Sequence, residues 1–319
     1  DKYGSSIITD LDRRAHDKSN ANFLILGNSG QGKSHLLKLL LINILESGKR
    51  VLCLDPEGEY REITEALGGS YLDLTEGRYR INVLEPQMWS AEEKEPDPEA
   101  PAAFQSGSIL SQHIAFLRDF FRSYKPFTEA EIDTIEIMPG RLYDSRGLRD
   151  DTDYSRLSPQ DYPILSDLYD QMDAEYQRVR AGSGGELYTP ELLRSACLGL
   201  HSMCKGADSK FFNGHTNIRD TRLITFGVKD LMEGGKNIKD AMLFNVLSYI
   251  NHALIAGGST AGVFEELHVF LSNPVAVSYI RSAMKRVRKR DSLIGLASQN
   301  IEDVLLPGVA EMTKPLFSI

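Results

Sequence analysis

The chain has 319 residues, of which 41% are hydrophobic and 25% charged, a composition typical of a folded globular protein with one large domain or two. Its formal net charge of −9 argues against a broadly basic surface for nucleic acid, although a local basic patch is compatible with it. Cys53, Cys197 and Cys204 are odd in number and lack C-x-x-C spacing, which excludes a disulfide framework or a zinc site as the organising feature. They are expected to be buried free thiols in a reducing compartment.

The sequence contains no membrane span of its own. Its longest apolar run, residues 36–45, is shorter than the ~20 residues that a span needs. The chain begins at Asp1 rather than Met and stops within the apolar run 315–319. We therefore expect a fragment of a longer protein, with any membrane anchor outside it.

The first strong signal in chain order is a glycine-rich loop between a predicted strand and a predicted helix. A polar segment, 1–20, with an edge-strand candidate at 7–11, leads into the apolar run 23–26, and a helical pattern covers 34–45. The sequence between them matches the G-x-x-x-x-G-K-[ST] phosphate-binding motif, in the strand–loop–helix context that the motif requires. The residues assigned to the nucleotide site are Gly27, Asn28, Ser29, Gly30, Gln31, Gly32, Lys33, Ser34 and His35.

The residue types of this loop suit a triphosphate and its metal. Gly27, Gly30 and Gly32 are expected to take positive φ, so that successive backbone N–H groups point at the phosphates. Lys33 would reach the β- and γ-phosphates, and the Ser34 hydroxyl would be a ligand of Mg²⁺. The N-terminus of the helix adds a favourable dipole for the anion. The alternative is a turn that only joins strand to helix.

A second buried strand, predicted over 50–55, ends in Asp55 and completes a βαβ unit with a right-handed crossover. Ligands bind at the carboxyl ends of parallel strands in open α/β sheets, so Asp55 or Glu59 is expected to position a water or to hold a metal-bound water. The alternative is a turn followed by an acidic helix N-terminus. A short helix ending at Leu67 and a strand over 71–74 are predicted next.

The pattern changes near Pro86. Residues 92–101 are acidic and rich in proline, which predicts a loop or linker. From about 104 to 204 the apolar residues recur at helical spacing, with a capping box at Thr128 and a helix start at Ser158-Pro159. We therefore predict a mainly helical subdomain over 86–204, inserted between the two parts of an α/β core, 1–85 and 205–319.

The core resumes after this insertion. Strands are predicted over 222–228, 262–268 and 293–298, and helices over 240–255, 274–288 and 301–306. The predicted fold class is α/β, with a mostly parallel sheet and an inserted all-α subdomain.

Two adjacent acids end the predicted strand over 262–268. A nucleoside triphosphatase needs one acid for the Mg²⁺ shell and one to activate water, and neighbouring positions in a strand point to opposite sides. We assign Glu265 to the metal and Glu266 to the water, the alternative being two surface acids on a loop. Gln299 ends the next strand, where an amide can sense the γ-phosphate and orient the water; ordinary capping of the strand is the rival. His268 is expected to pack or hydrogen-bond locally rather than to bind metal.

The basic run 285–290 has three interpretations: an arginine finger for a neighbouring subunit's nucleotide, a nucleic-acid contact, or a solvated helix face. An arginine finger stabilises charge on the transferring phosphoryl group, so one is expected if the enzyme works as a ring. The candidates are Arg286, Arg288 and Arg290.

Five motifs in order resemble a known family. They are Gly27 to Ser34, Asp55 to Tyr60, Glu265 to His268 followed by Leu271-Ser272-Asn273-Pro274, the basic run 285–290, and Ala297-Ser298-Gln299-Asn300. Together they resemble the C-terminal ATPase domain of VirB4/TraC-type conjugation ATPases, which belong to the HerA/FtsK group of RecA-like P-loop motors. The family usually has Asp-Glu-Ala-His where this chain has Glu-Glu-Leu-His, a departure that would weaken metal binding and slow hydrolysis.

This resemblance implies a function and partners. The protein would bind ATP and Mg²⁺ and hydrolyse ATP at the cytoplasmic face of the bacterial membrane, to power a type IV secretion or conjugation machine. It would contact other secretion components at the inner membrane and act as a homo-hexamer, although the isolated fragment is compatible with a monomer. Contact with DNA is also compatible with the family.

Three other functions fit parts of the sequence. The first is a DNA-translocating motor of the same superfamily, such as a coupling protein or a HerA-like helicase, which the acidic charge weighs against. The second is a nucleotide-gated assembly module with little turnover, which the Glu at 265 keeps open. The third is a small-molecule kinase, for which no lid-like arginine segment is seen.

Overall fold

The computed structural model describes residues 21–87, 100–105, 107–184, 187–232, 235–271 and 273–299. Within these residues the strands form one six-stranded sheet in the order β1-β6-β5-β2-β4-β3, and every neighbouring pair is parallel. All strands therefore begin at one edge of the sheet, the amino edge, and end at the other, the carboxyl edge. The strands are β1 (Phe23–Leu26), β2 (Arg50–Asp55), β3 (Ser70–Asp73), β4 (Leu223–Gly227), β5 (Thr260–Phe264) and β6 (Leu293–Ser298).

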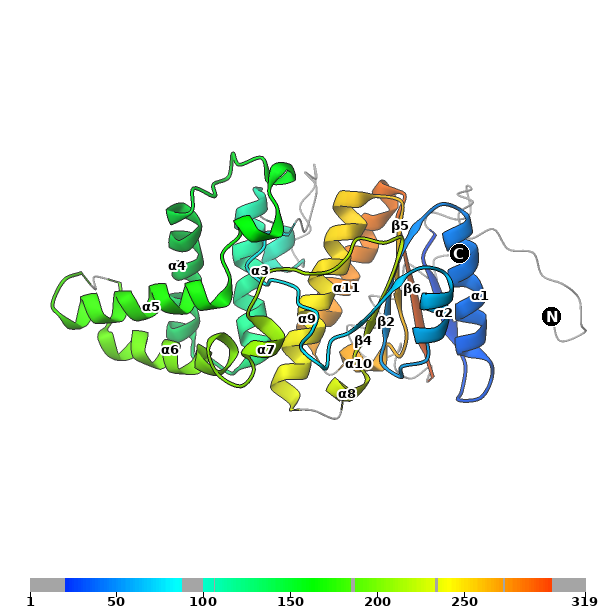
Figure 1. The fold of residues 1–319 in the computed structure, drawn as a ribbon, viewed down its shortest axis with the longest axis horizontal. Coiled ribbons are helices and arrows are strands. Elements are labelled where there is room, and N and C mark those ends of the chain that lie inside the picture. The colour runs from blue at the N-terminus through cyan, green and yellow to red at the C-terminus, as the bar shows by residue number, and fades with distance from the viewer. Residues whose placement is uncertain are drawn as a thin grey trace, which may run out of the picture.

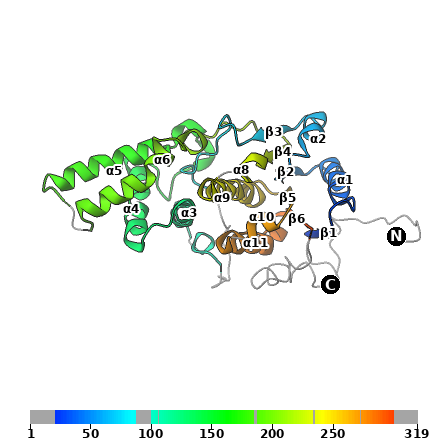
Figure 2. The ribbon, with the colours of Figure 1, turned by 90° about the horizontal axis from the view of Figure 1, so that it is seen from below.

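Helices cover both faces of this sheet (Figure 1, Figure 2). One face is covered by α1 (Lys33–Glu46) and α2 (Arg61–Ala66), and the other by α9 (Lys236–His252) and α11 (Pro274–Val287). Alternate residues of β2 belong to the hydrophobic cores on opposite faces of the sheet. Val51 and Cys53 pack with α1, whereas Leu52 and Leu54 belong to the core on the α9 side. Because both faces of the sheet are buried, the strand sequences are nearly continuous apolar runs. The predicted α/β class is confirmed.

The small residues of β5 have a packing reason. A Cβ added at Gly262 would lie 3.1 Å from Ile250 Cγ2 and 3.3 Å from Leu254 Cδ1, which are on the α9 side of the sheet. The absence of a side chain at this position therefore lets the helix pack close to the strand that ends in the two acids.

A group of helices follows β3 and precedes β4 in the chain, where the sequence predicted helices. Phe116 of α3 stacks on Phe244 of α9, with 5.3 Å between the ring centroids, so this group shares its core with the sheet domain. The division at residues 86 and 204 stays a prediction. The helices of this group are α3 (Ile109–Tyr124), α4 (Glu129–Ser145), α5 (Leu165–Arg180), α6 (Pro190–Cys204) and α7 (Ser209–Phe212).

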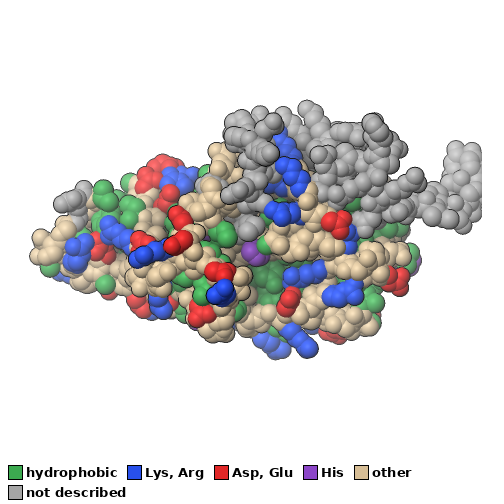
Figure 3. Space-filling view, turned by 90° about the horizontal axis from the view of Figure 1, so that it is seen from above, with side chains coloured by type: hydrophobic (Ala, Val, Ile, Leu, Met, Phe, Trp, Pro, Cys, Tyr) green, Lys and Arg blue, Asp and Glu red, His purple; other side chains and the backbone are tan. Residues whose placement is uncertain are grey.

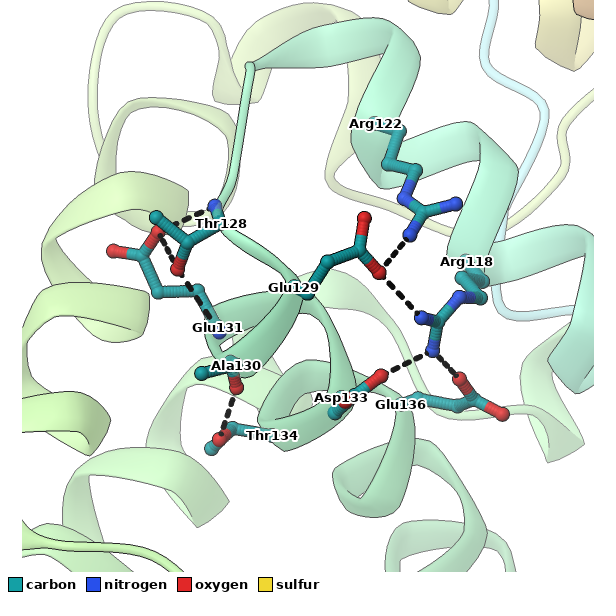
Figure 4. A network of polar contacts seen from close by, with 9 residues as sticks. All are labelled: Arg118, Arg122, Thr128, Glu129, Ala130, Glu131, Asp133, Thr134 and Glu136. Carbon is teal, nitrogen blue, oxygen red and sulfur yellow. Dashed lines mark hydrogen bonds and ion pairs between the residues drawn. The ribbon is translucent and has the colours of Figure 1, made fainter.

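An ion-pair network joins α3 to α4 (Figure 4). The Arg118 guanidinium contacts Glu129 at 3.0 Å, Asp133 at 2.6 Å and also Glu136, and Arg122 shares the Glu129 carboxylate. The first turn of α4 carries the predicted capping box, in which Thr128 Oγ1 accepts from the Glu131 N–H at 3.3 Å. Since α4 begins within this network, its position against α3 is set by charge as well as by apolar packing.

Several short elements complete the fold. Ser158-Pro159 begins only a single 3₁₀ turn, and α5 starts six residues later than that prediction, at Leu165. The edge-strand candidate 7–11 and the helix predicted over 301–306 lie outside the described residues. The three cysteines are buried and free, as predicted. The short elements are η1 (Ala102–Phe104), η2 (Tyr154–Arg156), η3 (Pro159–Asp161), α8 (Lys229–Met232), η4 (Ala253–Gly257), α10 (His268–Leu271) and η5 (Arg288–Arg290).

No helix among the described residues combines the length and the apolar character needed to cross a membrane.

Candidate functional site

The phosphate-binding loop lies between β1 and α1, at the carboxyl edge of the sheet. Gly30 and Gly32 have φ values of 78° and 80°, in the left-handed region where glycine is favoured, and Gly32 is the N-cap of α1. The prediction of positive φ was wrong for Gly27, whose N–H instead donates to Ser298 O at 3.3 Å and continues the pairing of β1 with β6. Apart from Gly27, Lys33 and Ser34, the residues assigned to the nucleotide are exposed and accessible to a ligand: Asn28, Ser29, Gly30, Gln31, Gly32 and His35.

The end of β5 brings Glu266 against the loop lysine. Lys33 Nζ lies 2.5 Å from Glu266 Oε1, and both side chains are almost completely buried. Gln299 Nε2 donates to the same oxygen at 2.8 Å, and His268 Nδ1 lies 3.1 Å from Oε2. Glu266 itself has a φ of 52°, an unusual conformation for a non-glycine residue that fits a constrained site. Residues more than 230 positions apart in sequence therefore meet around one carboxylate.

Glu265 faces the serine of the loop. Ser34 Oγ donates to Glu265 Oε1 at 2.7 Å, while Glu265 Oε2 is buried and accepts no hydrogen bond within the described part of the chain. Burial raises the pKa of the Glu265 carboxyl, although the hydrogen bond from Ser34 and the nearby charge of Lys33 act in the opposite direction. Carboxylate and hydroxyl oxygens are the ligands that Mg²⁺ prefers. The orphaned oxygen and the adjacent hydroxyl thus fit the predicted ion, although no cluster of three His, Cys, Asp or Glu side chains forms among the described residues.

The charge on Glu266 is stabilised by its neighbours. Burial alone would raise the pKa of this carboxyl, but the hydrogen bonds from Lys33 and Gln299 hold the pKa below its ordinary value. Glu266 is therefore ionised at neutral pH, the state in which a carboxylate can accept a proton from water.

Asp55 has a structural part in the site. Its carboxylate accepts the N–H groups of Gly58 at 2.8 Å, Glu59 at 3.1 Å and Tyr60 at 3.0 Å, and the Tyr71 hydroxyl at 3.2 Å. With both oxygens occupied and the residue fully buried, Asp55 shapes the turn after β2, which is the alternative that the sequence left open for it. The water-positioning role predicted for Asp55 is not supported by this arrangement.

Replacing Asp55 with alanine is expected to lower the free energy of unfolding by ~3 kcal/mol. The reason is that three backbone N–H groups and one hydroxyl would lose their acceptor in a buried turn. Urea denaturation measures this change, with Glu57→Ala as the control because Glu57 is exposed on the same turn. Equal stability of the two variants would contradict the role of Asp55 as the acceptor of the turn.

Glu59 and Tyr60 follow on the same turn. The exposed Glu59 carboxylate lies 3.9 Å from Lys38 Nζ, and its negative charge raises the pKa of Glu265. The catalytic role of Glu59 stays a prediction.

Tyr60 was not identified from the sequence. It is fully buried, and burial together with Cys53 and Glu265 raises the pKa of its phenol. His268 was expected to pack or hydrogen-bond locally rather than to bind metal. Its contact is with Glu266, two residues earlier in the chain, which places it beside the site.

The candidate finger arginines lie at the amino edge of the sheet, away from the nucleotide loop of their own chain. Arg290 O accepts the Ser259 N–H at 3.1 Å, just before β5 begins, and the Arg290 side chain is exposed. Arg286 is buried, with its guanidinium 4.8 Å from the centre of the Phe104 ring and Nη1 donating to Ser282 O at 3.1 Å. This position contradicts a role of Arg286 on a neighbour's nucleotide. The side chain of Arg288 lies outside what the structure describes.

Comparison with known proteins gives the family. The family described as "Helicase HerA, central domain" matches residues 18–193. The chain is similar to VirB4 of Thermoanaerobacter pseudethanolicus, with 30% identity and a TM-score of 0.82 over 99% of this chain and 79% of that one. It also shares its fold with the bacterial conjugative coupling protein TrwB, at 14% identity and a TM-score of 0.54 over 96% of this chain and 72% of that one.

The chain is also similar to two curated proteins. The Bacillus anthracis protein pXO2-09 is 24% identical over 95% of this chain and 51% of its own length. Protein TraC of Escherichia coli is 34% identical over 20% of this chain and 7% of its own length. The chain therefore spans about half the length of the first relative. With the phosphate loop, the paired acids and the parallel sheet in place, the chain belongs to the HerA central-domain family and, within it, is an ATPase domain of the VirB4/TraC type with a RecA-like P-loop fold.

Proposed function

We propose that this chain is a Mg²⁺-dependent ATPase motor domain that powers a type IV secretion or conjugation machine. The observation that carries the proposal is the meeting of Lys33, Ser34, Glu265, Glu266 and Gln299 at the carboxyl edge of the sheet. These are the groups needed to bind phosphates, hold a metal and activate water. The likeness to VirB4 supports the choice of machine.

The residues divide the chemistry between them. Ser34 and Glu265 would hold Mg²⁺, which when bound neutralises charge on the phosphates. Glu266 accepts the proton of the attacking water, and Gln299 orients that water through its amide. Lys33 contacts the phosphates, and to do so it leaves Glu266, because the two groups are now in direct contact at 2.5 Å. Nucleotide binding thereby frees the carboxylate that takes the proton.

The same contact supports a second candidate function, a nucleotide-gated assembly module with little turnover. Lys33 and Gln299 both donate to Glu266 Oε1, and a carboxylate with a lowered pKa is a weaker base. A DNA-translocating motor is the third candidate, supported by the fold shared with TrwB, which has also been solved with a non-hydrolysable GTP analogue.

The assembled protein would act as a homo-hexamer at the cytoplasmic face of the bacterial membrane, next to other secretion components. Within such a ring the exposed Arg290 is the candidate to reach a neighbouring nucleotide. DNA contact would take place in the pore of the ring.

A titration with Mg²⁺ tests the proposed reaction. Wild-type chain should hydrolyse ATP only when Mg²⁺ is present, and Ser34→Ala should need a higher Mg²⁺ concentration for half-maximal turnover, because one of the two oxygen ligands is lost. The control is Ser183→Ala, which changes an exposed serine in a distant loop. Turnover independent of Mg²⁺ would contradict the proposal.

In donor cells, loss of conjugative transfer when the full-length protein carries Ser34→Ala would support the proposed machine, whereas unchanged transfer would exclude it.

A further inference from the structure

A second cavity lies at the opposite edge of the sheet from the nucleotide site. It has a volume of about 690 Å³ and lies between the end of α9, the start of β2 and the segment that carries η2 and η3. Its lining includes Arg50, the first residue of β2, and Gly257, shortly before β5. The nucleotide residues follow β1 and β5, at the lower edge in Figure 1 where α8 and α10 lie. The cavity is therefore a separate site.

Unsatisfied polar atoms point to a ligand in this cavity. Gln87 lines it and is only 6% exposed, yet its Oε1 accepts no hydrogen bond from any residue that the structure describes, while its Nε2 donates to Glu85 O at 3.2 Å. Arg50 Nε is likewise buried, and in the described part of the chain it has no acceptor, although Nη2 contacts Asp220 at 2.7 Å. A buried polar group without a partner destabilises the fold by ~1–3 kcal/mol, so a ligand that supplies both a donor and an acceptor would be favoured here.

The wall of the cavity contains an irregular backbone. The α9 helix continues into a π-helical turn, η4, whose residues Ala253, Ala256 and Gly257 line the cavity. Such turns are rare and occur frequently at functional sites. The small side chains at these positions leave the space open. If this end of α9 only packed against its neighbours, larger side chains would be expected to fill that space.

The charged and aromatic lining identifies the kind of ligand. The charged residues of the lining that the structure describes are one guanidinium, Arg50, and three carboxyl groups, Glu85, Asp153 and Asp220. Asp220 is paired with Arg50 and Asp153 with Arg156, which lies outside the lining, while burial raises the pKa of Glu85. Burial lowers the pKa of His252 to about 4, so this histidine adds no charge at neutral pH. The aromatic residues of the lining are Tyr154, Tyr162 and Tyr249.

A cation fits this lining better than an anion does. Carboxylates and tyrosine rings both attract a guanidinium, through charge-assisted hydrogen bonds and cation–π contacts. A nucleic-acid phosphate would meet the carboxylates instead, and acidic and basic side chains are interspersed on the helical part of this face of the molecule (Figure 3). An arginine within a peptide supplies guanidinium donors for Gln87 and the acids, and a main-chain carbonyl for Arg50.

We propose that this cavity binds an arginine side chain presented by a protein partner. The site is independent of ATP and of the chemistry at the carboxyl edge. A partner of the machine could thus be held at one edge of the sheet while the nucleotide is bound at the other.

Calorimetric titration of the 319-residue chain with the peptide Gly-Gly-Arg-Gly-Gly tests this proposal. The matched control peptide carries citrulline, which keeps the shape of arginine and removes its charge. The arginine peptide should bind about tenfold more tightly than the citrulline peptide, the effect expected for one charge-assisted contact.

Variants locate the binding. Glu85→Gln and Asp153→Asn should each weaken binding of the arginine peptide about five- to tenfold, whereas Glu191→Gln, an exposed acid on α6, should leave it unchanged. Asp153→Asn keeps the oxygen that accepts from Ser155 N, so it serves if Glu85→Gln does not fold. Equal affinity for the two peptides, or no binding of either, overturns the proposal. Binding of an oligo-dT strand that Glu85→Gln abolishes would also overturn it, in favour of a nucleobase.

Discussion

Replacing Glu266 with glutamine is expected to lower the rate of ATP hydrolysis by about 10²–10⁴-fold, which is the usual contribution of a general base. Glutamine preserves the length of the side chain and still offers an oxygen to Lys33 and Gln299, which now contact Glu266 Oε1. It cannot accept the proton of the attacking water. ATP affinity should be equal or higher in the variant, because Lys33 no longer has to leave an ionised partner before it contacts the phosphates.

Two measurements separate these effects. Single-turnover hydrolysis reports the chemical step, and equilibrium binding of a fluorescent ATP analogue reports affinity. Glu57→Gln is the matched control, because Glu57 is an exposed glutamate on the turn after β2. A variant that hydrolyses ATP within about threefold of the wild-type rate would exclude Glu266 as the general base.

Local signals were sufficient to predict most of the candidate site. The loop motif located Lys33 and Ser34, and the rule that parallel strands end at one edge brought Glu265, Glu266 and Gln299 to the same place. The structure confirms this meeting with three side-chain hydrogen bonds. Such contacts join the ends of strands, whose positions follow from topology once each strand has been recognised.

The residue roles that could not be predicted from the sequence depend on the surroundings of each side chain in the folded protein. Asp55 carries the same sequence signal as an acid at a strand end that binds ligand, and only the backbone path of 56–60 turns three N–H groups onto it. Arg286 belongs to a basic run, yet its position on the inner face of α11 places it against Phe104, a residue 182 positions earlier in the chain. Tyr60 is close to Glu265 because β2 pairs with β5, which no local pattern contains.

The helices between β3 and β4 show a similar limit. Their helical type follows from the 3.6-residue spacing of apolar residues, but the packing of α3 against α9 depends on contacts such as Phe116 with Phe244. The cavity beside η4 also arises between segments distant in sequence, so its acidic and aromatic lining has no signature in any one of them.

Replacing Lys33 with alanine is expected to weaken ATP binding by more than about 100-fold and to abolish turnover, because the charge that faces the β- and γ-phosphates is lost. The same change should lower the free energy of unfolding of the free protein by ~2 kcal/mol. Stability should fall because Glu266, which is 2% exposed, would lose the Lys33 ammonium group that now lies 2.5 Å from its Oε1. Thermal or urea denaturation without nucleotide measures this second effect.

The stability effect should depend on pH in a defined direction. In the wild-type protein, Lys33 and Gln299 hold the pKa of Glu266 below its ordinary value, so the ion pair stabilises the fold above the unfolded pKa of about 4.3. That contribution is lost as the pH falls through the lower folded pKa, where Glu266 becomes protonated. The difference in unfolding free energy between wild type and Lys33→Ala should therefore be constant near neutral pH and shrink in acid. Lys33→Arg is the matched control, since it keeps the positive charge and should retain more of the stability than of the ATP affinity. A stability difference that does not change with pH would show that Lys33 contributes by packing, and would leave the proposed release of Glu266 by nucleotide without support.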